Sequence, residues 1–207
     1  ARDGARDGQG VSAGLTTVQT VAVADELRVA TSRLFEVFGA WASEADRSDI
    51  AVSLATASRH MGWHTDDLAA LVPSAEGLDP EPDDAAPADP AGRSTPEPGP
   101  LDAALDAIRA TPGSVARLAI AHRVLLPRLA AGCVTVERAS AHHTDAPLAR
   151  VVGFVLSDAR RDRDEGELLL ERLITDTDTV EQVGAATVDA ERRLVAAGGL
   201  LPVTLAL

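Results

Sequence analysis

Hydrophobic side chains recur every three or four residues in several long stretches of this chain, which is the spacing of amphipathic helices. In the first stretch the apolar stripe is Leu27, Ala30, Leu34, Val37 and Trp41. In the second it is Ile50, Leu54, Ala57, Met61, His64, Leu68 and Leu71, and Pro73 is expected to end that helix. Because only a short joint separates the two stretches, we expect them to form an antiparallel helical hairpin.

Three further helices are predicted in the second half of the chain. The third long helix carries the stripe Leu118, His122, Leu125, Leu129, Gly132 and Val136, with Thr111 and Pro112 at its start. Pro127 lies inside this helix and is expected to kink it, because proline removes one backbone hydrogen bond. Asp145 and Pro147 open the fourth helix, whose stripe is Leu148, Val151, Val155, Ala159, Asp162, Leu169 and Leu173. The fifth helix is predicted to begin at the capping box Asp178–Glu181 and to end at Gly198 and Gly199.

Proline, aspartate and glutamate crowd the stretch between the two predicted hairpins, which indicates an acidic, semi-extended linker at residues 73–111 with a short helix at LDAALDAIRA. The repeated ARDG at the start predicts a disordered tail over residues 1–20. We therefore predict one helical-bundle domain, 21–198, interrupted by that linker. Residues 199–207 form an apolar tail that we expect to pack across one end of the bundle.

Charge and composition exclude some classes of function. The formal net charge is −13 and no basic patch offsets it, so nucleic acid is not an expected partner. The single cysteine, Cys133, permits no internal disulfide, which fits a reducing compartment. No uninterrupted apolar run reaches the roughly 20 residues that span a bilayer. No signal-peptide pattern opens the chain. We expect a cytoplasmic protein without a membrane partner.

In this layout the chain resembles the ferritin-like superfamily over roughly residues 20–175. The resemblance implies an all-α, up-down bundle of two helical hairpins joined by a long crossover, with an added C-terminal helix here. Members often hold two metal ions through a Glu on the first and third helices and a Glu-x-x-His motif on the second and fourth. This chain has no Glu-x-x-His: its second helix reads ASRHMGWHTDD and its fourth LSDARRDRDEGE.

The strongest candidates for metal chemistry are two histidines on the second predicted helix. His60 and His64 are four residues apart and share a helix face, a spacing that can chelate a transition metal. Asp158 and Asp162 on the fourth predicted helix could complete a site for iron, manganese or zinc. The simpler interpretation, which we favour, makes His64 a core histidine, His60 a boundary residue and the acids partners of arginines.

The depth of these groups along their helices bears on whether they can meet. His64 and Asp162 each lie about 27 Å past the turn that precedes their helix. If the two turns lie at opposite ends of the bundle, as in the ferritin arrangement, His64 and Asp162 should miss each other by something like 15 Å. Only His60 and Asp158 are then expected to approach one another.

These patterns lead to a principal functional hypothesis and two alternatives. The first is a non-catalytic helical-bundle protein without a cofactor, which binds a protein partner or forms a homodimer. The second is a metal-dependent oxidoreductase, di-iron or mononuclear, that uses His60, His64 and the two aspartates. The third is a small-molecule carrier with an apolar pocket beside the predicted kink, lined by His122, Leu125 and Pro127.

Overall fold

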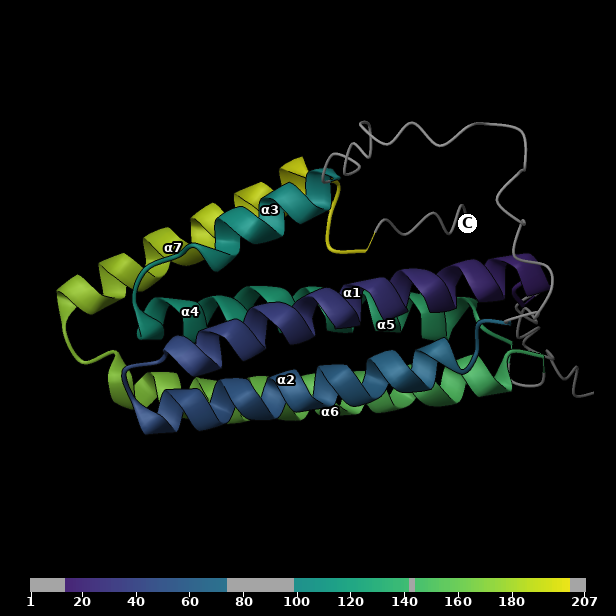
Figure 1. The fold of residues 1–207 in the computed structure, drawn as a ribbon, viewed down its shortest axis with the longest axis horizontal. Coiled ribbons are helices and arrows are strands. Elements are labelled where there is room, and N and C mark those ends of the chain that lie inside the picture. Colours follow the sequence, from purple (N-terminus) through teal and green to yellow (C-terminus); the bar gives the residue numbers. More distant parts are fainter. Residues whose placement is uncertain (1–13, 74–98, 142–143, 202–207) are drawn as a thin grey trace, which may run out of the picture.

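The computed structural model of the chain describes residues 14–73, 99–141 and 144–201. These residues form helices and no strand, which confirms the all-α prediction. Figure 1 shows them in layers, with two long helices in front, two behind and a shorter pair above. Of the predicted 1–20 tail, residues 1–13 lie outside the described residues, and the first helix already begins at Thr17.

The front layer is the predicted hairpin of α1 (Thr17–Glu44) and α2 (Ser48–Ala69). A capping box closes the first turn of α1, because the Thr16 side chain accepts from the Gln19 backbone while the Gln19 side chain accepts from Thr16. All five predicted stripe residues of α1 are buried, and so are those of α2 up to Leu68. Buried apolar surface is therefore what holds the hairpin to the rest of the bundle.

The rear layer contains a continuous helix, Ser114–Ala139, followed by α6 (Ala146–Leu173). The first of these comprises α4 (Ser114–Ile120), a π-helical turn η1 (Ala121–Leu125) and α5 (Leu126–Ala139). In Figure 1 the turn from α1 to α2 and the turn from α5 to α6 lie at opposite ends, so α2 and α6 run antiparallel. That orientation decides which side chains meet between the two layers.

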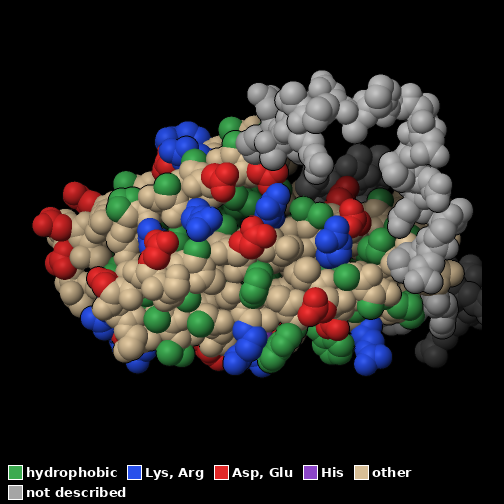
Figure 2. All heavy atoms as spheres, viewed as in Figure 1, with side chains coloured by type: hydrophobic (Ala, Val, Ile, Leu, Met, Phe, Trp, Pro, Cys, Tyr) green, Lys and Arg blue, Asp and Glu red, His purple; other side chains and the backbone are tan. Residues whose placement is uncertain are grey.

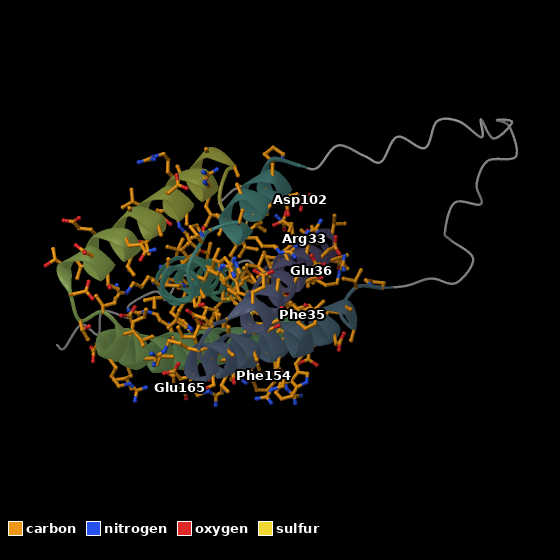
Figure 3. The ribbon with its side chains drawn as sticks, turned by 60° about the vertical axis from the view of Figure 1, so that its left-hand side comes forward. Arg33, Phe35, Glu36, Asp102, Phe154 and Glu165 are labelled. Carbon is orange, nitrogen blue, oxygen red and sulfur yellow. The ribbon has the colours of Figure 1, made fainter. Side chains whose placement is uncertain are left out.

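The upper pair, α3 (Pro100–Arg109) and α7 (Thr177–Ala196), covers α1 and α4 (Figure 1). The indole N–H of Trp41 donates to the Arg109 carbonyl at 2.9 Å, which ties α1 to the end of α3. Between α1 and α3, the Arg33 guanidinium lies 2.9 Å from the Asp102 carboxylate and 3.5 Å from the Glu36 carboxylate. Figure 3 shows the three side chains together. The short helix predicted within the linker is therefore part of the bundle.

The predicted kink at Pro127 takes the form of the π-helical turn. The Leu126 N–H, just before the proline, bonds to the Ala121 carbonyl five residues back. Proline cannot donate a backbone hydrogen bond, and π-turns of this kind often lie at functional sites. His122 occupies this turn.

Two predicted helix starts were wrong by two residues. The third long helix is capped by Gly113 rather than by Thr111, and Gly113 takes a left-handed φ of 84° where the preceding loop ends. The fifth, α7, is capped by Asp176 rather than by Asp178, since the Asp176 side chain accepts from the Thr179 N–H at 2.8 Å.

The apolar C-terminal residues that the structure describes pack onto the bundle. Leu200 is buried, and Leu201 lies so close to Gly132 that a β-carbon there would meet it at 2.1 Å. Residues 202–207 of the predicted tail lie outside the described residues. The absence of a side chain at position 132 thus makes room for the Leu201 side chain.

One described helix, Ser114–Ala139, reaches the length and mean hydropathy of a membrane-spanning segment. Its most apolar 18-residue window has a mean hydropathy of 1.3, and 61% of that window is buried inside the protein. A helix at the centre of a bundle needs the same composition, because other helices surround it.

Candidate functional site

Polar side chains interrupt the apolar core along the contact between α2 and α6, here called the polar seam and defined by His60, His64, Asp158 and Asp162. The Nδ1–H of His60 donates to both carboxylate oxygens of Asp162, at 2.8 and 3.0 Å. Both side chains are buried. A carboxylate that accepts from one ring nitrogen fixes the orientation of the imidazole ring.

The second pair of the polar seam is less regular. His64 Nε2 lies 3.1 Å from Asp158 Oδ2, yet the angle is not that of a hydrogen bond. Among the described residues neither ring nitrogen of His64 has a hydrogen-bond partner, although the residue is only 3% exposed. Asp158 is also paired with Arg161 on the same helix. A buried ring nitrogen without a partner carries a desolvation penalty that a water or an ion would remove.

The antiparallel orientation of α2 and α6 explains these pairings and corrects one prediction. Moving four residues forward along α2, from His60 to His64, corresponds to moving four residues back along α6, from Asp162 to Asp158. His60 therefore meets Asp162, and His64 meets Asp158. The expectation that only His60 and Asp158 would approach was wrong, because counting from the turns ignored how far the two helices are shifted along each other.

Burial dominates the electrostatics of the polar seam. It raises the pKa of Asp162, although the hydrogen bond from His60 partly offsets the rise. It lowers the pKa of His64, against the opposing attraction of Asp158 and Asp67. The seam therefore favours neutral histidine at His64, which is the form that can bind a metal ion.

The structure shows only part of the geometry that the predicted metal site requires. All four candidates lie along one seam, but they are arranged as two separate pairs. Within the described residues, no group of three or more His, Cys, Asp or Glu side chains has a geometry that could hold a metal ion. Transition-metal sites in proteins usually take three or four protein ligands, so each pair alone falls short of a complete site.

His122 lies next to the polar seam, on the π-helical turn. Its Nε2 shares a hydrogen bond of 3.2 Å with Ser53 Oγ of α2, and burial lowers the pKa of His122 to about 4. A cavity of about 570 Å³ opens beside it, lined among others by Ser53, Thr56, His122, Asp162, Glu165 and Arg172. The imidazole is therefore neutral near pH 7 and borders a cavity with both polar and apolar walls.

The carrier hypothesis had placed an apolar pocket beside His122, Leu125 and Pro127. Of these three residues only His122 lines the cavity described above, whose walls also include the apolar side chains of Val52, Leu168 and Leu169 beside its hydroxyl, carboxylate and guanidinium groups. Leu125 is fully buried in the core, on a face of the helix that the cavity does not reach. The π-helical turn thus lies beside a cavity with both polar and apolar walls, and the carrier hypothesis stays a prediction.

A second feature lies on the outer surface of the hairpin and was not predicted from the sequence. A groove of about 900 Å³ runs along the joint between α1 and α2, and we call it the outer groove. Small residues form its floor: Gly39, Ala42, Ala51, Ala55, Ser58 and Gly62. Phe35 and Trp63 stand beside it and are 47% and 56% exposed. Figure 2 shows this face, where apolar side chains reach the surface between scattered charges.

Trp63 connects the outer groove to the polar seam. Its ring lies 5.7 Å from the His60 ring, and the Arg59 guanidinium lies 5.3 Å above the indole. Such a cation–π contact is worth about 0.5–1 kcal/mol at an exposed site. In the sequence, Phe35 and Trp63 stood outside the apolar stripes, and this was the one signal that could have indicated an exposed aromatic surface.

The candidate site therefore has two neighbouring parts: the polar seam with its adjoining cavity, and the outer groove. Both depend on α2, which presents its histidines to α6 and its small residues to solvent. No protein-family model, no curated protein and no solved structure matches this chain.

Proposed function

We propose that this chain is a non-catalytic helical bundle of ferritin-like architecture that binds a protein partner through the outer groove of α1 and α2. The groove is the observation that carries the proposal. It combines a floor of small residues with large apolar side chains held in solvent. Patches of this kind on soluble proteins mark interaction sites, and aromatic residues dominate the binding energy of protein interfaces.

The order and direction of the helices support the ferritin-like part of the proposal. Two helical hairpins lie against each other, and α2 ends at the opposite end of the bundle from the start of α4 (Figure 1). An up-down bundle with one long crossover has this plan. The upper pair, α3 and α7, is an addition to it.

The geometry of the polar seam supports a structural role for its residues. His60 and Asp162 satisfy one another, and His122 bonds to Ser53 across the layers. Buried polar groups that pair in this way fix the position of one helix against another. In this proposal the seam sets how α2 lies on α6, and α2 in turn forms one wall of the outer groove.

Photo-crosslinking in the cells that naturally produce the protein tests the proposal. A photo-reactive amino acid replaces Val52, which lines the outer groove and is 66% exposed. We expect a crosslinked product of discrete mass. The matched control carries the same probe in place of Val188 on α7, which is 57% exposed and lies far from the groove. Equal products from both positions, or none from Val52, would contradict the proposal.

A metal-dependent oxidoreductase is the second candidate, and His64 is the observation that favours it. A buried imidazole 3.1 Å from a carboxylate, without a hydrogen bond between them, is the spacing of two ligands on a shared cation. Iron, manganese or zinc would need further ligands, which His60 and Asp162 supply only by giving up their own hydrogen bond. Plasma mass spectrometry on protein purified without chelators measures the metal. Near-stoichiometric metal that is lost in His64→Ala would support this candidate, whereas metal-free protein would reject it.

A further inference from the structure

We propose that the cavity beside His122 binds a small organic cation, a primary ammonium carried on a short apolar chain. The ammonium lies between Asp162 and Glu165 of α6, and its chain follows the apolar wall of the cavity toward the turn between α1 and α2. This inference goes beyond the proposed function, because the cavity and the outer groove are lined by different faces of α2 and share only Val52.

The cavity has the size and the access of a small-molecule site. Its volume of about 570 Å³ falls within the range of about 300–1,000 Å³ that such sites occupy. Buried side chains form its inner wall, since His122, Asp162 and Leu169 are each at most 5% exposed. Glu165 and Leu168 are exposed and stand at its mouth, and Figure 3 shows Glu165 at the surface of the bundle. A ligand can therefore enter from solvent and reach a buried carboxylate.

The carboxylate of Asp162 on the inner wall has few partners for a buried charge. Within the described residues it accepts hydrogen bonds only from the His60 ring, although a carboxylate has about four lone-pair sites. Burial raises the pKa of Asp162, and the attraction of His60 and Arg161 does not cancel the rise. A cation placed in the cavity would therefore stabilise the charged form of this side chain.

The arginines around the cavity leave its acidic end without a cation. Arg161 is paired with Asp158. Arg123 is held by Glu167 at 2.8 Å. Arg172 lines the cavity, but on α6 it lies about 15 Å by helical rise from the buried carboxylate. A neutralising cation at this end is therefore a ligand rather than a side chain of the described residues.

The acceptors at the acidic end match the three N–H donors of a primary ammonium. Asp162 and Glu165 are three residues apart on α6 and thus share a helix face. The antiparallel register of α2 and α6 puts the Thr56 hydroxyl close to the level of Glu165. Two carboxylates and one hydroxyl are therefore available at the same level of the cavity.

Apolar side chains continue the cavity from its acidic end. Leu168 and Leu169 of α6 and Val52 of α2 line it in the direction of the turn that joins α1 to α2. The rise from Thr56 to Val52 gives this wall a length of about 6 Å, which a hexyl chain spans. A metal ion would gain nothing from such a wall, and within the described residues no group of three His, Cys, Asp or Glu could hold one. The wall therefore favours an alkylammonium ligand.

An NMR titration of the full-length, isotope-labelled chain with hexylamine tests the inference at about pH 7, where the amine is charged. We expect saturable shifts of the amide signals of Ser53, Thr56 and Leu168, with a Kd of about 0.1–1 mM for so small a ligand. Hexan-1-ol has the same chain without the charge, and hexyltrimethylammonium has the charge without an N–H donor. Each should bind at least about tenfold more weakly than hexylamine.

A matched pair of variants separates the site from general attraction of cations to a chain with a net charge of −13. Glu165→Gln removes a carboxylate from the mouth of the cavity and should weaken hexylamine binding by about five- to tenfold. Asp164→Asn removes the same charge from the next position of α6, where the side chain is 75% exposed and does not line the cavity. This control should leave the Kd within about twofold of the parent value.

Two further variants act on the cavity itself. Asp162→Asn removes the buried carboxylate and should abolish saturable binding, and circular dichroism verifies that the variant folds. Leu168→Arg adds a guanidinium at the exposed mouth, where it does not disturb the core, and should abolish binding by repelling the ammonium. This second variant keeps the test decisive if Asp162→Asn does not fold.

Each contrary outcome overturns the inference. These outcomes are the absence of saturable shifts up to about 10 mM hexylamine, and hexan-1-ol or hexyltrimethylammonium binding as tightly as hexylamine. Equal losses in Glu165→Gln and Asp164→Asn, or parent-like binding by Leu168→Arg, count in the same way. The Val52 crosslinking experiment tests the proposed function separately, so either proposal can fail while the other stands.

Discussion

The imidazole of His122 packs directly against the backbone of α6 at Gly166. A β-carbon at position 166 would lie 2.2 Å from the ring, a distance at which one of the two groups must move. His122 is buried and its ring is held by the hydrogen bond with Ser53, so moving the ring away from Gly166 would disturb that bond. The glycine at 166 is therefore what lets the π-helical turn approach α6.

Replacing Gly166 with alanine should destabilise the protein despite the higher helix propensity of alanine. Overpacking a core position costs about 1–3 kcal/mol, and the propensity gain of about 1 kcal/mol offsets only part of it. Gly153→Ala is the matched control, since a β-carbon at that position of α6 meets nothing within 4 Å. Urea unfolding should show Gly166→Ala to be less stable than the parent chain and Gly153→Ala to be more stable. Equal gains in both would disprove the close packing.

The stability of the protein should fall as the pH drops from about 6.5 to about 4. Burial lowers the pKa of His122 to about 4, so in this window the unfolded chain binds a proton that the folded chain does not. The loss due to His122 should be roughly 3 kcal/mol, and the lowered pKa of His64 acts in the same direction. Urea unfolding of the parent chain and of His122→Gln across this window measures it. The variant should show a shallower pH dependence, and identical slopes would refute the assignment.

Replacing one member of the buried pair His60 and Asp162 should lower the free energy of unfolding more than replacing both together. Removing either partner alone leaves a buried polar group without its hydrogen bond, which costs about 1–3 kcal/mol. In His60→Leu with Asp162→Leu together, no such group remains, and apolar replacement of a buried pair is often neutral or stabilising. A double-mutant cycle by thermal unfolding measures the coupling. Additive single effects would show that the two side chains act independently.

Asp145 should be a stability determinant, because its side chain joins the start of α1 to the loop before α6. It accepts from the backbone N–H groups of Ala141 at 2.8 Å and Leu15 at 3.1 Å, and from the Thr20 hydroxyl at 3.4 Å. Burial alone would raise the pKa of Asp145, but these hydrogen bonds outweigh it and lower the pKa. Asp145→Ala should therefore cost about 2–3 kcal/mol. Hydrogen exchange should show faster opening at the start of α1, and unchanged exchange there would argue against the link.

The sequence alone predicted the helices and their buried faces. Apolar spacing identified α1, α2, the Ser114–Ala139 helix and α6, and their stripe positions are buried or half-buried. The capping box and the terminal glycines identified α7. The helix starts at Ser114 and Thr177 were missed by two residues. A cap depends on the φ of one glycine or the reach of one side chain, and neither follows from the apolar pattern.

Only the tertiary structure decided which polar groups meet and which surface is left open. The residues His60, His64, Asp158 and Asp162 were identified from the sequence, but their pairing depends on how far α2 is shifted along α6, which neither helix encodes alone. The outer groove depends on the close approach of α1 and α2 at Gly39 and Gly62. Helical periodicity is a local property of the chain and can be read from it. The shift between two packed helices is the joint result of all the side chains between them.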